Sequence, residues 1–156
     1  MAGTSAFGTL LYSGSFAGLT AGSNNLLYAQ VTNIERSGAK VDMVDTTAHD
    51  SSGGYKEMAP TFINPGEVKL DLNWNPNLSG HASGSISGSA GTLGLEYLMV
   101  NKTKQLFTIY VPAATTAYKQ SFSAYVSDFS WKAPYDGVLT ASATLTISGA
   151  VTSGSA

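Results

Sequence analysis

The sequence predicts a mainly β fold with one flanking α-helix. Several segments alternate apolar and polar residues with the period of a strand, two C-terminal segments have the pattern of a long hairpin, and one short segment has helical spacing. The chain has 156 residues, of which 43% are hydrophobic, so it is large enough for one domain with its own core. We therefore expect a single domain over residues 1–156.

The clearest strand signal is EVKLDLNW, residues 67–74. Its alternate positions are apolar and share one face: Val68, Leu70, Leu72 and Trp74. Residues 26–35 and 40–44 are shorter β-like runs on either side of RSGA, which predicts a hairpin turn between them.

Three further segments complete the strand pattern. Gln105–Val111 is β-rich and is followed by Pro112. In Tyr118–Lys132 the apolar positions change parity, and a β-bulge near residues 126–128 would return them to one face. After the turn APYDG, residues 138–151 form the second strand of the long hairpin. Because Trp74 and Trp131 lie on apolar faces, we expect both in the core.

The last strand has two chemically distinct faces. Its odd positions from 139 to 147, and position 151, are apolar, so this face should pack in the core. Its even positions carry only hydroxyl side chains: Thr140, Ser142, Thr144, Thr146 and Ser148. This hydroxyl face is either an ordinary solvent face or a contact surface; solvent faces normally include Lys and Glu, which this one lacks.

One helix is expected at residues 92–100, between two strand regions. Leu93, Tyr97 and Leu98 share a face, and Asn101 and Lys102 end the pattern.

Three segments lack regular patterning. Residues 45–66 are polar and contain glycine, and irregular loops of this length are usually functional or disordered. Residues 1–25 hold no charge, since the first charged residue is Glu35, and predict an arm or a first strand that lies against protein. Residues 152–156 predict a flexible tail.

Composition excludes several classes of function. The net charge is −2, so the chain lacks the basic patch that tight nucleic-acid binding requires. It has no cysteine, which excludes disulfides, thiolate metal sites and cysteine nucleophiles. The N-terminus has neither the basic region of a secretory signal nor the apolar run of a membrane span. Charged residues are only 12% of the chain, and a surface poor in charge is typical of interface cores.

No catalytic or cofactor-binding constellation stands out. His49 lies beside Asp50, with Asp42 and Asp45 upstream, but the spacing matches no zinc or calcium pattern and predicts a polar loop. His81 lies in a second loop, where an exposed side chain is expected. The glycines at 88, 91 and 94 lack the Lys and Ser/Thr of a phosphate-binding loop. We predict no enzyme activity, no metal and no cofactor.

The segment from residue 44 to residue 77 resembles the major tail tube proteins of long-tailed, lambda-like phages and gene transfer agents. The matching features are Asp45-Thr46-Thr47, a polar loop with Glu57, the Pro65-Gly66 entry into a strand, and Trp74 and Pro76 at that strand's end. Downstream, FTIYVP and FSAYVSDFSWKAPYDGVLTASATLTISGAV resemble the closing strands of the family. No single motif is diagnostic, but the ordered set is specific and spans residues 26–151.

The resemblance implies two packed antiparallel sheets, a β-sandwich closing in part to a barrel, with one flanking helix. It implies hexameric rings that stack into a hollow virion tail tube through which DNA passes without specific binding. The partners would be further copies of the chain and the tape-measure, tail terminator and baseplate proteins, with no membrane. The protein would be made in the cytoplasm of a bacterial host.

We also predict two groups of functional residues, which the resemblance itself does not assign. An assembly loop would contact a neighbouring subunit or ring through Asp45, Thr46, Thr47, His49, Asp50, Tyr55, Lys56 and Glu57. A channel-lining surface would include Thr140, Ser142, Thr144, Thr146, Asp128 and Asp136, because a wall without Lys or Arg would not hold phosphates. The alternative is a β-sandwich ligand-binding module, of the carbohydrate-binding or adhesin-like kind.

Overall fold

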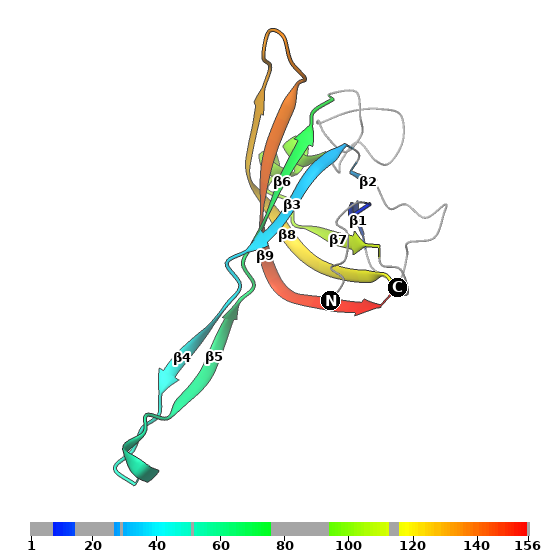
Figure 1. Cartoon of the computed structure of the whole chain (residues 1–156). Coiled ribbons are helices and arrows are strands. Elements are labelled where there is room, and N and C mark those ends of the chain that lie inside the picture. Colours follow the sequence, from blue (N-terminus) through cyan, green and yellow to red (C-terminus); the bar gives the residue numbers. More distant parts are fainter. Residues whose placement is uncertain are drawn as a thin grey trace.

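The computed structural model describes residues 8–14, 27–28, 30–50, 52–75, 94–112 and 116–155 (Figure 1). The elements in chain order are β1 (Leu10–Ser13), β2 (Leu27–Tyr28), β3 (Val31–Ser37), β4 (Lys40–Asp45), the 3-10 turn η2 (Ser52–Gly54), β5 (Met58–Asn64), β6 (Glu67–Asn73), α1 (Leu95–Val100), β7 (Gln105–Val111), β8 (Tyr118–Lys132) and β9 (Thr140–Ser155). The mainly β fold with one short helix is confirmed: the described residues form two antiparallel sheets, and the larger one curls into a half-barrel.

The larger sheet has the strand order β2-β1-β7-β8-β9-β6-β3. Its long strands β8 and β9 pair along their whole length and bend sharply about halfway (Figure 1). The predicted bulge is confirmed, since the register shifts between Val126 and Asp128. A second shift, between Phe122 and Ala124, lies opposite the stretch around Gly149, whose φ of 104° favours glycine. The two bulges bend the β8–β9 ribbon, so that it follows the curved surface of the core.

The core fills the inner side of this curl. The predicted alternation of β6 and β9 is confirmed, because Val68, Leu70, Leu72, Ala141, Ala143, Leu145 and Ile147 are all buried. Helix α1 packs against β8 through the buried Leu95 and Leu98. It begins later than expected, because the described helix starts at Leu95.

Aromatic rings and one hydroxyl pair complete the core near β1 and β7. Phe107 lies 5.7 Å from the ring of Tyr28 and 6.1 Å from that of Phe122, measured between centroids. Burial raises the pKa of the Tyr28 phenol. Thr108 Oγ1 donates to the Gly14 carbonyl at 2.7 Å and lies 2.8 Å from Ser121 Oγ, so these buried hydroxyls are hydrogen-bonded.

The hairpin predicted at RSGA is wrong. β3 pairs with β6, and β4 pairs with β5. The chain therefore runs outward along β3 and β4 and returns along β5 and β6, as one long ribbon. Part of the segment expected to be irregular is strand, because Met58–Asn64 forms β5.

Two other expectations are corrected at strand ends. Residues 152–155 of the expected tail belong to β9 and pair with Tyr118–Ser121 of β8. Trp131 is not in the core: it lies on the apolar face, as predicted, but is 56% exposed because the hairpin extends beyond the core. Trp74 is partly buried against the core. Within the uncharged N-terminal stretch, residues 10–13 form β1, with Leu11 fully buried.

Candidate functional site

The most distinctive feature is an arm, Lys40–Asn64, in which β4, η2 and β5 project away from the body (Figure 1). Two glycines with positive φ, Gly38 at 75° and Gly66 at 84°, form its base. A Cβ on Gly66 would lie 2.1 Å from the Ser37 carbonyl oxygen and 2.7 Å from the Ala39 nitrogen. Only glycine allows the two strands to approach this closely, so the sequence PG specifies where the arm leaves the sheet.

The arm exposes apolar side chains on both faces. Val41 pairs with Ile63 on one face, and Val44 pairs with Ala59 on the other. Its most exposed large apolar residue, Phe62, has 80% of its surface accessible. The others are Val41, Met43, Val44, Tyr55, Met58 and Ile63. A lone two-stranded ribbon is marginally stable in water, and exposed apolar side chains gathered in this way are typical of interaction surfaces.

Five of the eight residues predicted for the assembly loop meet near the arm's outer end. Thr47 donates to Asp45 Oδ1 from its backbone N, at 2.9 Å, and from its hydroxyl. The Glu57 N donates to Thr47 Oγ1 at 2.9 Å, and the Thr46 N donates to the Glu57 carbonyl at 2.8 Å. Lys56 Nζ lies 4.0 Å from Asp45 Oδ2. These contacts close the turn that joins β4 to β5.

The Thr47 hydroxyl, and then its backbone N–H, lower the pKa of the Asp45 carboxyl. The other three predicted residues, His49, Asp50 and Tyr55, are exposed beside this network. The sequence prediction missed the apolar residues of β5, although the segment MAPTFIN contains several of them.

The predicted channel residues lie mostly on the outer face of the large sheet. Across β9, Thr140, Ser142, Thr144 and Thr146 oppose Lys132, Ser130, Asp128 and Tyr125 of β8 and Asn73, Asp71, Lys69 and Glu67 of β6. Cross-strand pairs share a face, so four of the predicted hydroxyls and Asp128 belong to one surface, here called the polar face. Asp136 does not, because it lies in the turn between β8 and β9.

The polar face is hydrogen-bonded and mildly acidic. Ser142 Oγ donates to Asp71 Oδ1 at 2.8 Å, and Thr146 Oγ1 donates to Ser127 Oγ at 2.9 Å. The paired positions of β3, β6, β8 and β9 that share this face include four acidic residues, Glu35, Glu67, Asp71 and Asp128, and two basic ones, Lys69 and Lys132, so their net charge is −2. The β3 and β6 members were missed because sequence does not give the register that brings them beside β9.

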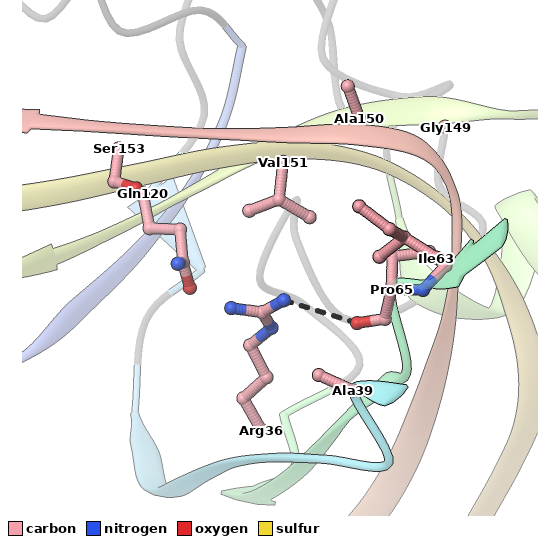
Figure 2. Close-up of a pocket in the computed structure, with 9 residues that line it drawn as sticks. All are labelled: Arg36, Ala39, Ile63, Pro65, Gln120, Gly149, Ala150, Val151 and Ser153. Carbon is pink, nitrogen blue, oxygen red and sulfur yellow. Dashed lines mark hydrogen bonds between the residues drawn. The ribbon is translucent and has the colours of Figure 1, made fainter. Parts of the chain in front are cut away.

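An open pocket lies between the base of the arm and the bend of β9 (Figure 2). It has a volume of about 540 Å³ and is lined mainly by small and apolar side chains, with Gln120 and Arg36 among them. Arg36 Nη2 donates to the Pro65 carbonyl at 3.2 Å. Within the described residues, Arg36 forms no ion pair with a carboxylate.

Two searches of the described residues found nothing. No three His, Asp or Glu side chains among them lie close enough together to hold a metal ion, and His49 stands apart from any such group. In the same part of the chain, no helix is long and apolar enough to cross a membrane. His81 and the glycines at 88 and 91 lie outside the described residues.

Comparison with solved structures shows that this fold is similar to that of chains in virion tails and tail tubes. No family model and no curated protein matches the sequence. A chain of a native gene transfer agent virion is 11% identical, with a TM-score of 0.60 over 93% of this chain and 95% of that one. A chain of the SPP1 tail tube is 14% identical, with a TM-score of 0.57 over 94% and 76% of the two chains.

A contractile injection system also contains a chain of similar fold. A chain in the sheath/tube terminator structure of PVC, an extracellular contractile injection system, is 10% identical, with a TM-score of 0.61 over 99% of this chain and 98% of that one. The resemblance to tail tube proteins is thus confirmed at the level of the fold, over nearly the full length.

Proposed function

We propose that this protein is the structural subunit of a virion or phage-like tail tube. Copies form rings, the rings stack into a hollow tube, and DNA passes through the tube without specific binding. The observation that carries this proposal is the arm, which exposes apolar residues on both faces within a fold shared with tail tube chains. The protein acts as a building block and has no catalytic activity.

Hexameric rings are part of the proposal. Their support is a chain from the tail of an empty gene transfer agent particle with C6 symmetry, which has a TM-score of 0.60 at 12% identity over 92% of this chain and 93% of that one. A ring interface that repeats head to tail closes on itself, and stacked rings extend without limit. Tape-measure, terminator and baseplate proteins are the further partners, and the protein is made in the host cytoplasm before it joins the tail.

The arm is the contact between subunits or rings, and its residues Asp45, Thr46, Thr47, Lys56 and Glu57 fix the shape of the arm's outer end. His49, Asp50 and Tyr55 are then contact residues. The polar face, with Thr140, Ser142, Thr144, Thr146 and Asp128, lines the channel. Its support is the net charge of −2 over the paired positions, which would not retain phosphates.

The pocket beside Arg36 favours the alternative, a ligand-binding module, because its volume of about 540 Å³ lies in the range of small-molecule sites. Sedimentation velocity and negative-stain microscopy of the purified chain separate the two functions. The proposal expects rings or tubes, and a variant lacking Ser51–Lys56 should stay a folded monomer. A wild-type chain that remains monomeric at all concentrations contradicts the proposal. A deletion variant that builds normal tubes contradicts the role of the arm.

A further inference from the structure

A cluster of aromatic side chains lies at one end of the large sheet. The rings of Trp74 and Trp131 stack with centroids 5.1 Å apart and an interplanar angle of 21°. Phe129 meets Trp74 edge-on at 6.4 Å and 65°. Together with Tyr135 and Val138 of the adjoining turn, these three residues are here called the aromatic end.

The aromatic end continues the buried face of the sheet beyond the core. Phe129 is opposite the buried Ala143, and Trp131 is opposite the buried Ala141. Trp131 is nevertheless 56% exposed, and the Tyr135 side chain is fully exposed. At this end of the strands the apolar side chains of the same face are exposed to solvent. Exposed apolar patches of this kind mark sites of interaction with a partner.

The stacked tryptophans support the same conclusion. Tryptophan is enriched among the residues that dominate binding interfaces, and the half-exposed ring of Trp131 offers a flat apolar surface on top of Trp74.

The position of the aromatic end in the molecule indicates which partner fits. The turn between β8 and β9 lies at the top of Figure 1, and the arm projects from the opposite end. The arm of a chain therefore cannot reach its own aromatic end, but a copy stacked in the same orientation presents its arm to it. Such a contact is heterologous, the kind that generates open filaments.

We propose that the aromatic end is the receptor for the arm of a second copy in the next ring. This inference rests on the proposed tube function and names the surface at which the rings join. Phe62, the most exposed large apolar residue of the arm, covers Trp131. Lys132 and Asp136 give the receptor turn one charge of each sign, so it does not repel the acidic arm.

The chain has no cysteine, so engineered pairs can test this contact without background. Phe62→Cys and Tyr135→Cys, combined in one chain and oxidised in assembled tubes, should give a ladder of disulfide-linked dimers, trimers and longer species. A mixture of the two single variants should stop at dimers. The matched control combines Phe62→Cys with Lys104→Cys, which is exposed elsewhere, and should give no ladder. Dimers from Phe62→Cys alone would show arm-to-arm contact and overturn the proposal.

A second test uses the interface side chain itself. Trp131→Ala should raise the protein concentration needed for tube formation by at least about tenfold, as loss of an interface anchor does. Trp131→Phe should restore most of it, and monomer melting should change little. Two outcomes, observed with a wild-type chain that forms tubes, overturn the receptor assignment. One is unchanged assembly of Trp131→Ala, and the other is a ladder from the control double variant equal to that from the designed pair. If the wild-type chain builds no tubes, the proposed function itself fails.

Discussion

Replacing Gly66 by alanine tests whether the base of the arm depends on a close approach of two backbones. Alanine at a φ of 84° is in the left-handed region, which costs about 1–2 kcal/mol for a residue with a Cβ. The new methyl would lie 2.1 Å from the Ser37 carbonyl oxygen, a backbone atom that cannot rotate away. Relieving such overpacking costs about 1–3 kcal/mol more. The sum is about 2–5 kcal/mol, a large part of the roughly 5–15 kcal/mol that stabilise a typical domain.

Thermal unfolding of the monomer measures this loss. At about 2–4 °C per kcal/mol for a chain of this size, Gly66→Ala should lower the Tm by about 4–20 °C. Gly149→Ala is the matched control, because Gly149 also has positive φ, 104°, but a Cβ there would meet nothing within 4 Å. The control should lose only the conformational part, about 2–8 °C. Equal melting temperatures for the two variants would refute the steric argument.

Three further perturbations address the core, the arm and the polar face. Phe107→Ala removes a fully buried ring and should destabilise the monomer by about 3–5 kcal/mol in chemical denaturation; a loss below about 1 kcal/mol would contradict the core assignment. The folded-state pKa of Asp45 is lowered, so its contribution to stability is present above the ordinary value of 3.8 and is lost as the pH falls through the lowered pKa. The Thr47 amide resonance should therefore shift over this acid range, and Asp45→Asn should abolish the shift; an unchanged titration in that variant would disprove the contact. Thr144→Lys with Thr146→Lys should leave tubes intact but slow DNA ejection, most strongly at low salt, because lysines at the channel wall act within about 8 Å at physiological salt. The corresponding serine variants are the neutral control, and tubes that fail to assemble would place this face at a subunit contact.

The strands with strict alternation were predictable from sequence. In β6, and in β9 as far as Ile147, each second residue is apolar, and one buried face follows from that period alone. The bulge near Val126 was also predictable, because only an extra residue reconciles the two parities of β8.

Partner choice between strands was not predictable. The segment RSGA contains an ordinary turn signal, yet its Gly38 lies at the base of the arm. β3 instead pairs with β6, whose residues lie 30 to 41 positions further along the chain. The exposure of Trp131 was also not predictable from sequence. The alternation of apolar residues predicts on which face of the strand Trp131 lies, but not how far the core extends along that strand. The polar face required the same register information, which is why Asp71 and its neighbours on β6 were missed.

Cryo-electron microscopy of the assembled chain tests the central claim most directly. We expect hollow tubes built of stacked rings, with the arm between rings and with Thr144 and Asp128 facing the channel. Solid particles, sheets, or tubes whose channel wall is formed by a different face would contradict the assignment, and a chain that stays monomeric under all conditions would contradict the tail tube function itself.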